Sequence, residues 1–312
     1  MSLRETDNVL EEIKEELARR EVSTLEDAQL VMDEITTRRN RAPQMRFCGL
    51  SPEAVHRFLH FPFESTGFVE FRSVVAGSDV TSRIGRLFLL LAAAIGEDGV
   101  KTTATGNLPR SMVRSIAAES MTEEQLVEMT QTARIQTEMD FHDLHVTRIV
   151  GQQSGLIRKL NGRFVVTKAC RKLLADSGLA EIYPRLFRAY TTRYNWGYSS
   201  RGPEIPFVQR AFVFSLYLLH RFGDEWRAPA FYEDAFLQAF PSVLEEIVDL
   251  PYMSGEALLR LIFQLEFLSR FCEFFGLIEA SHHSTFRREM TAVRKTSFFN
   301  EVVRFHIQDA AC

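Results

Sequence analysis

The residues with the clearest chemical potential are cationic and lie in one stretch that has no acidic residue. Between Leu144 and Ala175 the chain contains neither Asp nor Glu. The same stretch holds seven cationic residues, namely Arg148, Arg158, Lys159, Arg163, Lys168, Arg171 and Lys172. Cationic side chains gathered in this way neutralise phosphates and release the counterions that surround a nucleic acid. The formal net charge of -4 excludes a globally basic coat, so such binding would be local.

This pattern predicts a DNA-binding surface. Polar residues on the helix before the predicted hairpin are expected to meet base edges in the major groove, whereas cationic residues of the hairpin and of its neighbouring helices are expected to contact phosphates. The predicted binding residues are Arg110, Arg114, Thr147, Arg148, Gln152, Arg158, Lys159, Arg163, Lys168 and Arg171.

Two other interpretations of the same charges stay open. The cationic stretch also has the composition of a solvated face that pairs with the acidic amino-terminal helix, within the chain or in a homodimer; that helix holds Glu11, Glu12, Glu15 and Glu16. The negative total charge and the aromatic C-terminal part equally suit an adaptor that binds a protein partner through an exposed apolar patch. DNA binding or regulation is therefore the first hypothesis, and a protein-protein interaction adaptor is the second.

Histidine pairs are the candidate metal ligands. His142 and His145 lie in a segment with two aspartates, and His56 and His60 are four residues apart, which places both on one face of a helix. Neither pair has the further Cys or carboxylate pattern that would complete a four-ligand site. We predict no metal and no cofactor, and we keep a metal-dependent enzyme that uses His142 and His145 as the third hypothesis.

The chain has none of the common catalytic or nucleotide-binding loops. The patterns G-x-x-x-x-G-K-[ST], G-x-G-x-x-G after a strand and G-x-S-x-G are absent. His220 precedes Asp224 and Glu225, but it is more simply the end of a core helix. An enzyme is therefore not predicted, and no catalytic residue is assigned.

The cationic residues lie on elements in the order of a winged helix. Apolar periodicity predicts a helix over 80–96, and a β-branched run predicts a strand over 100–103. Helices follow at 107–118, from Thr122 onward and at 140–154. Asn161-Gly162 between two apolar-containing runs predicts a β-hairpin over 155–167, because both turn residues tolerate positive φ. With a helix over 168–175, this order is typical of the helix-turn-helix variant in which a hairpin flanks the recognition helix.

The regions on either side are also predicted to be helical. Residues 4–20 and 24–39 predict a helical hairpin, whose second helix opens with the capping box Ser23-Thr24-Leu25-Glu26. After the Gly, Ser and Pro residues of 196–206, helices are predicted over 207–222, 230–240 and 255–275. A second hairpin begins with Gly276-Leu277-Ile278, as the first begins with Gly155-Leu156-Ile157, which predicts a second, degenerate winged helix. The predicted regions are a helical N-terminal region (1–79), a winged-helix-like domain (80–195) and an aromatic-rich helical domain (196–312).

Composition agrees with a packed, mainly α protein. Of the 312 residues, 46% are apolar and 25% are charged, which is typical of a globular chain. The longest apolar run, Leu87 to Ile95, is about half the ~20 residues that a membrane span needs. The amino end has no secretory h-region. The four cysteines form no C-x-x-C, which suits reduced thiols, so we predict a cytoplasmic location and no membrane association.

Short segments throughout the chain resemble a family of uncharacterised bacterial proteins. These segments are Gly49-Leu50-Ser51-Pro52-Glu53, Thr103-Ala104-Thr105-Gly106-Asn107-Leu108-Pro109-Arg110, Tyr194-Asn195-Trp196, and Ser215-Leu216-Tyr217-Leu218-Leu219-His220 with Gly223-Asp224-Glu225. The resemblance implies a shared architecture and no particular activity. Some relatives carry a Cys-rich zinc-binding tail, which Asp309-Ala310-Ala311-Cys312 cannot supply.

Overall fold

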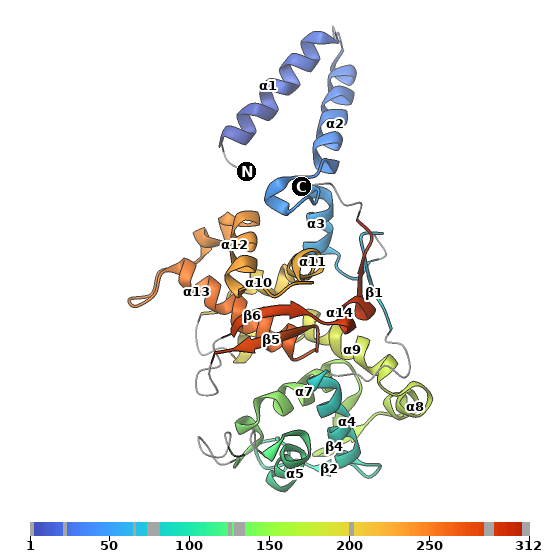
Figure 1. The fold of residues 1–312 in the computed structure, drawn as a ribbon. Coiled ribbons are helices and arrows are strands. Elements are labelled where there is room, and N and C mark those ends of the chain that lie inside the picture. Colours follow the sequence, from blue (N-terminus) through green and yellow to red (C-terminus); the bar gives the residue numbers. More distant parts are fainter. Residues whose placement is uncertain are drawn as a thin grey trace. The chain divides into compact units, whose positions relative to one another are not determined.

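The structure is a computed structural model that describes residues 3–20, 24–64, 67–73, 82–123, 127, 135–199, 203–283 and 290–307. The chain divides into two compact units (Figure 1). Unit 1 consists of Met1–Glu64 and Ile307–Cys312, and unit 2 consists of Ser65–His306. Helices predominate in both units, which confirms the predicted mainly α class.

Unit 1 contains the predicted helical hairpin. Its elements are α1 (Leu3–Arg19), α2 (Leu25–Arg41), a 3-10 turn η1 (Met45–Phe47) and α3 (Pro52–His60). Thr24 caps α2 by accepting a hydrogen bond from the backbone N–H of Asp27, so the cap is one residue later than the predicted Ser23, which lies outside the described residues. Glu12 of α1 accepts hydrogen bonds from Arg38 and Arg39 of α2, and these bonds tie the two helices together.

The first half of unit 2 carries the predicted cationic stretch. Its elements are β1 (Val69–Phe71), α4 (Arg83–Ile95), β2 (Val100–Lys101), α5 (Arg110–Ser120), a 3-10 turn η2 (Glu138–Asp140), α7 (His142–Gln153), β3 (Ile157–Leu160), β4 (Arg163–Val166), α8 (Lys168–Ser177) and α9 (Leu179–Thr192). The order of these elements matches the predicted order. Most of the helix predicted from Thr122 onward lies outside the described residues.

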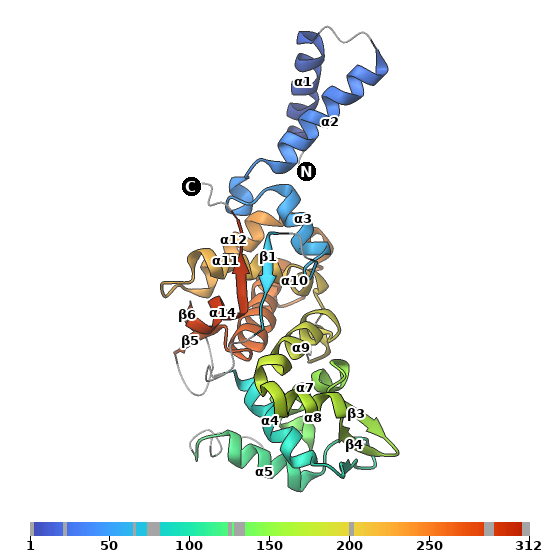
Figure 2. The same cartoon turned by 90° about the vertical axis from the view of Figure 1, so that its right-hand side faces the viewer.

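The strands β2, β4 and β3 form a small antiparallel sheet in that order. Asn161 and Gly162 connect β3 to β4 with φ angles of 48° and 70°, the positive values that the Asn-Gly pair predicts. Figure 2 shows this hairpin projecting sideways from the helices of unit 2. Ile157, Phe164 and Val166 of the hairpin are buried, whereas Arg158, Lys159 and Arg163 are exposed.

The second half of unit 2 is built around aromatic helices. Its elements are η3 (Trp196–Ser199), α10 (Pro206–Arg210), α11 (Phe212–Phe222), α12 (Pro229–Ala239), η4 (Pro241–Glu246), α13 (Gly255–Ile262), η5 (Phe263–Glu273), β5 (Ile278–His282), β6 (Met290–Lys295), α14 (Ser297–Val302) and β7 (Val303–Phe305). The helix predicted over 255–275 is interrupted, because η5 is a π-helix, with hydrogen bonds from residue i to residue i+5. Strand β7 returns to pair with β1.

The two hairpins are entered and left in the same way. Gly155 after α7 and Gly276 after η5 both have φ of 75°. Thr167 and Thr296 cap the helices that follow the hairpins, and their hydroxyls donate to the carbonyls of Gly155 and Gly276, at 3.1 and 2.8 Å. The matching tripeptides in the sequence therefore correspond to the same local structure.

A short extended segment also flanks each hairpin. In the first, β2 pairs with β4 through Val100 opposite Phe164. In the second, an isolated antiparallel bridge joins Arg227 to Val293 of β6. Helix, short strand, helices and hairpin thus occur twice along unit 2.

Residues on both sides of position 195 share one aromatic core. The ring of Trp196 lies 5.6 Å from that of Tyr190 and 5.1 Å from that of Phe271. Tyr183 of α9 donates a hydrogen bond to the carbonyl of Phe275 at 2.9 Å. The regions predicted as 80–195 and 196–312 therefore pack together within unit 2.

Candidate functional site

The outer face of the β2–β4–β3 sheet carries three cationic residues. Because side chains alternate across a strand and directly paired residues point to the same face, Lys101, Arg163 and Arg158 share the face opposite the buried Phe164. All three are exposed. No acidic residue belongs to these three strands, which the structure describes in full; Glu97 and Asp98 lie in the turn before β2. The face is therefore a small cationic surface, here called the cationic face.

Two of these residues are directly opposite each other. Lys101 pairs with Arg163 in the β2–β4 ladder, and like charges in that position destabilise a sheet. Arg163 donates to the carbonyls of Asp98 and Gly99, at 3.2 and 2.7 Å, which holds its guanidinium beside the turn. Lys101 and Arg158 form no side-chain hydrogen bond or ion pair within the described residues. Their charges are directed to solvent.

The remaining cationic residues of the predicted surface lie around this face. Lys159 is exposed on the other side of the hairpin, where its amino group lies against Gly106. Arg110 is exposed at the start of α5, and Lys168 is exposed at the start of α8. Arg114 is exposed but donates to the carbonyl of Ile135 at 3.0 Å. Arg171 lines a groove against α4.

Two of the three predicted base-reading residues of α7 are buried. Thr147 is fully buried, and its hydroxyl donates to the carbonyl of Asp143 at 2.7 Å. Arg148 is buried, and it donates to Glu138 at 2.6 Å and to Gln152. Gln152 is half-buried and accepts a hydrogen bond from Arg148. The sequence interpretation of Thr147 and Arg148 as exposed groove residues does not agree with this packing, because α7 is enclosed by α4, α9 and β3. The binding surface therefore excludes them.

Glu138 is the centre of the buried network that holds α7. It accepts hydrogen bonds from the backbone N–H of Leu108 at 2.6 Å and from Arg148, and a 2.8 Å hydrogen bond joins it to Nδ1 of His145. Burial alone raises the pKa of Glu138, but the bond to His145, the charge of Arg148 and the Leu108 N–H outweigh it, so the pKa lies below its ordinary value of 4.5. Glu138 is therefore a structural carboxylate that ties the loop before α5 to α7.

The histidine pairs do not form metal sites. His145 is committed to Glu138, and the rings of His56 and His60 lie 4.6 Å apart on α3 without a further ligand. Nε2 of His282 lies 3.3 Å from Glu273, and His283 beside it is exposed. Among the residues that the structure describes, no three His, Cys, Asp or Glu side chains are grouped closely enough to hold a metal ion.

The second hairpin provides an internal comparison for the cationic face. Its Glu279 occupies the position that Arg158 occupies in the first hairpin, directly after Gly-Leu-Ile. Glu279 lies opposite Arg294 in the ladder and forms an ion pair with it at 2.8 Å. Arg294 also lies over the ring of Trp226, at 5.0 Å. The same backbone therefore carries neutralised charge in one hairpin and solvent-directed cationic charge in the other.

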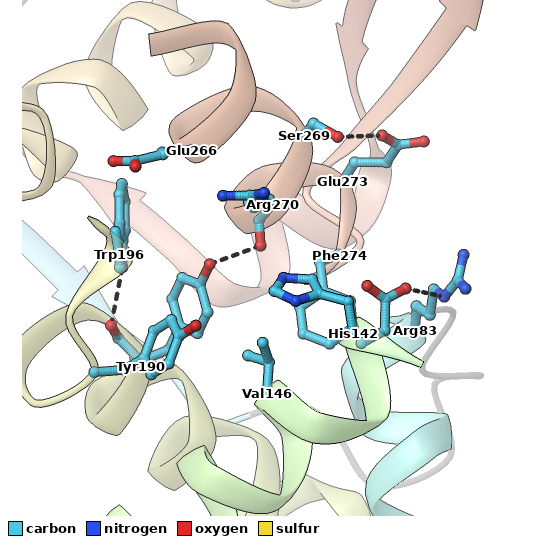
Figure 3. A pocket seen from close by; sticks show the side chains of 12 residues that line it. Arg83, His142, Val146, Tyr190, Trp196, Glu266, Ser269, Arg270, Glu273 and Phe274 are labelled. Atoms are coloured by element: carbon cyan, nitrogen blue, oxygen red, sulfur yellow. Dashed lines mark hydrogen bonds and ion pairs between the residues drawn. The ribbon is translucent and has the colours of Figure 1, made fainter. Parts of the chain in front are cut away.

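A polar cavity of about 110 Å³ lies elsewhere in unit 2 (Figure 3). Its walls come from α7, α9, the segment before η3, and the π-helix η5, with Arg83 contributed by α4. The lining residues are Arg83, His142, Asp143, Val146, Tyr190, Tyr194, Trp196, Glu266, Ser269, Arg270, Glu273 and Phe274. Both charge signs and several aromatic rings thus meet in one small space.

Fixed hydrogen bonds orient the walls of this cavity. The Tyr190 hydroxyl donates to the carbonyl of Arg270 at 2.9 Å, and the Trp196 indole N–H donates to the carbonyl of Tyr190 at 3.0 Å. Arg83 and Asp143 form an ion pair at 2.7 Å. Burial lowers the pKa of His142 below 6.5, with Asp143 opposing that shift and the charge of Arg270 adding to it. His142 is therefore uncharged at neutral pH.

The sequence analysis did not find this cavity or Lys101 of the cationic face. In the sequence, His142 was considered only as a candidate metal ligand. Glu266 and Arg270 lie on a π-helix, a geometry that has no recognised sequence pattern. The one sequence signal for Glu266 and Arg270 is that they carry opposite charges within an otherwise largely apolar helix segment, Phe263 to Phe274.

One comparison with known proteins finds a family model that matches part of unit 2. Residues 80–179 match the family model of the Y4jL N-terminal domain. This match covers about a third of the chain, from α4 to the first residue of α9, and therefore includes the cationic face. The predicted resemblance to an uncharacterised family is confirmed for this segment. No curated protein and no solved structure matches the chain.

The described helices were also compared with the requirements of a membrane span. None of them is both long enough and apolar enough to cross a bilayer.

Proposed function

We propose that the chain binds duplex DNA through the phosphate backbone, using the cationic face of the Y4jL N-terminal domain segment. The observation that carries this proposal is the difference between the two hairpins. Arg158 has no acidic partner where the equivalent Glu279 is paired with Arg294. Cationic side chains without partners release counterions when they meet phosphates, which is the main source of affinity in non-specific DNA binding.

The winged-helix interpretation belongs to this proposal. The order α4, β2, α5, α7, β3, β4 and the pairing of β2 with the hairpin support it. The repeated Gly-Leu-Ile connection supports a second, degenerate winged helix from α11 to β6. The burial of α7 favours contacts with phosphates over base readout, because Thr147 and Arg148, two of the three residues expected to read bases, are enclosed.

The competing interpretation, an internal pairing with the acidic N-terminal helix, is less well supported. Glu12 is already paired with Arg38 and Arg39, and Glu16 is paired with Arg19 and Arg20. These two carboxylates are therefore neutralised inside unit 1. DNA as the partner also agrees with the predicted cytoplasmic location.

Fluorescence anisotropy with a labelled mixed-sequence duplex at low salt tests the proposal. The variant R158E/K159E reverses two exposed charges that make no bond in the described structure. Its affinity is expected to fall about tenfold or more, because each change removes an attraction and adds a repulsion. The control K14E/R210E makes the same change in net charge at exposed residues that are not part of the hairpin. Equal affinities for the two variants, or no binding by the wild type, would reject the proposal.

A second candidate, self-association as an interaction module, is favoured by one observation. A groove of about 820 Å³ lies between α4 and α8, with a floor that includes Ala92, Val166 and Leu174. Leu89 on its edge is 38% exposed. An apolar groove of this kind suits a second copy of the chain. Sedimentation across a concentration series tests this: a dimer that Leu89→Asp dissociates supports it, and a monomer at every concentration excludes it.

A further inference from the structure

The polar cavity has a solvent-facing rim and a buried floor. The side chains of Arg83, Asp143 and Glu273 on the rim are 38%, 28% and 37% exposed. Glu266 on the floor is only 2% exposed, and Trp196 beside it is equally buried. The volume of about 110 Å³ far exceeds the ~10–15 Å³ that a water needs and is below the ~300–1,000 Å³ of pockets for drug-sized ligands. The cavity therefore suits an occupant of metabolite size.

The floor of the cavity is a rigid aromatic surface. Hydrogen bonds fix the polar atoms of Trp196 and Tyr190, as described above. Tyr190 stacks on Phe271 at 5.6 Å with an interplanar angle of 11°, which supports the ring from behind. Aromatic faces held in this way attract cationic groups. The floor thus favours a ligand that carries an ammonium group.

The π-helix places a carboxylate and a guanidinium group at this cavity. Glu266 and Arg270 are four residues apart on η5, and Figure 3 shows both side chains at the cavity. Both residues also take part in interactions within the protein itself. π-helical segments are rare and occur frequently at functional sites. The unusual helix geometry and the charge pair therefore coincide at one place.

The charges of the walls select the charge type of the ligand. Three carboxylates (Asp143, Glu266, Glu273) and two guanidinium groups (Arg83, Arg270) line the space. His142 adds no charge at neutral pH. A ligand with only negative or only positive charge would meet like charges on the wall, whereas a small zwitterion places each of its ends near the opposite charge.

We propose that this cavity binds a free α-amino acid, with the ammonium group at Glu266 and the aromatic floor and the carboxylate at Arg270. Arginine is the side chain best suited to a carboxylate, because its planar fork donates two parallel hydrogen bonds. Asp143 is held in the ion pair with Arg83, and Glu273 lies near Ser269 and His282. The carboxylates of Asp143 and Glu273 therefore form part of the rim. This site is separate from the proposed DNA-binding surface and does not depend on it.

The test is a thermal-shift screen of the full chain with each of the standard α-amino acids, followed by calorimetric titration. A saturating ligand is expected to raise the unfolding temperature by about 5 °C. For each amino acid that binds, its amide, which lacks the carboxylate, and its N-acetyl form, which lacks the ammonium group, are expected to give no shift. Equal shifts from either derivative would overturn the zwitterion proposal, as would the absence of a shift with every amino acid.

Variants assign the binding to the two charged residues. Glu266→Gln and Arg270→Met are expected to weaken binding by about tenfold or more, whereas Arg270→Lys keeps the charge and binds with intermediate affinity. Glu245→Gln and Arg210→Met, at exposed positions outside the cavity, are the matched controls. Tryptophan fluorescence confirms that each variant is folded. If Glu266→Gln misfolds, the comparison of Arg270→Met with Arg270→Lys decides the test. Wild-type affinity in Arg270→Met would reject the site.

Discussion

The substitution Glu138→Gln tests the buried network that holds α7. Glu138 has no exposed surface, and it accepts hydrogen bonds from Leu108 and Arg148 and is bonded to His145. Glutamine keeps the size of the side chain but removes the negative charge, so the buried guanidinium of Arg148 loses its counter-charge. Removing one partner of a buried ion pair costs about 3–5 kcal/mol, and we expect the lower end because glutamine can still accept a hydrogen bond.

The expected loss converts into a measurable change in unfolding temperature. Domains of about 150–250 residues lose roughly 2–4 °C per kcal/mol, so a loss of about 3 kcal/mol lowers the midpoint by roughly 6–12 °C. Tryptophan fluorescence is the assay, because both tryptophans of the chain, Trp196 and Trp226, lie in unit 2. Glu119→Gln, at an exposed position on α5, is the control. A midpoint within about 1 °C of the wild type would refute the reasoning.

The pH dependence gives the same prediction an independent check. The pKa of Glu138 is lower in the folded protein than its ordinary value of 4.5, so its contribution to stability is present above that value. The contribution is lost as the pH falls through the lowered pKa, when the carboxylate takes up a proton. The difference in stability between the wild type and Glu138→Gln is therefore expected to narrow as the pH falls below about 4.5. A constant difference down to acid unfolding would contradict the assigned charge.

Three further predictions follow from particular contacts. Lys101→Thr is expected to raise the stability of unit 2 by a few tenths of a kcal/mol, because it removes the repulsion with Arg163. The same change is expected to weaken DNA binding. Lower stability with unchanged DNA affinity would contradict this prediction. Gly99→Ala is expected to cost more than about 1 kcal/mol, because a Cβ would lie 2.5 Å from the carbonyl oxygen of Phe164. Gly155→Ala has a similar φ but open space around it, so thermal unfolding should show a smaller loss. Burial raises the pKa of Cys170 to about 11 and that of Cys272 well above its usual range. Peptide mass spectrometry should therefore find both thiols unmodified by iodoacetamide in the folded protein at pH 8, and modified in urea.

Local sequence chemistry predicted the elements that depend on a few neighbouring residues. Asn161-Gly162 predicted the first hairpin because the turn requires two positive φ angles, and the repeated Gly-Leu-Ile tripeptide predicted the second. The cationic residues of the hairpin were found from the absence of acidic residues between Leu144 and Ala175.

Features that depend on residues far apart in the sequence could not be predicted from local patterns. Arg148 has the appearance of a surface cation in the sequence, and only the packing of Glu138 beside it makes its burial possible. The π-helix has the periodicity of an ordinary helix at its apolar positions, so its interruption of the predicted 255–275 helix was not foreseen. The polar cavity is lined by residues between Arg83 and Phe274, which are too far apart in the sequence for a local pattern to indicate that they meet.

The salt dependence of DNA affinity tests the central claim most directly. Three phosphate contacts, from Lys101, Arg158 and Arg163, predict that the logarithm of the association constant falls with the logarithm of salt concentration with a slope of about -2.7. The R158E/K159E variant should lose the Arg158 contact, giving a slope of about -1.8, while K14E/R210E should keep the wild-type slope. Identical slopes for the wild type and R158E/K159E would contradict binding through the cationic face.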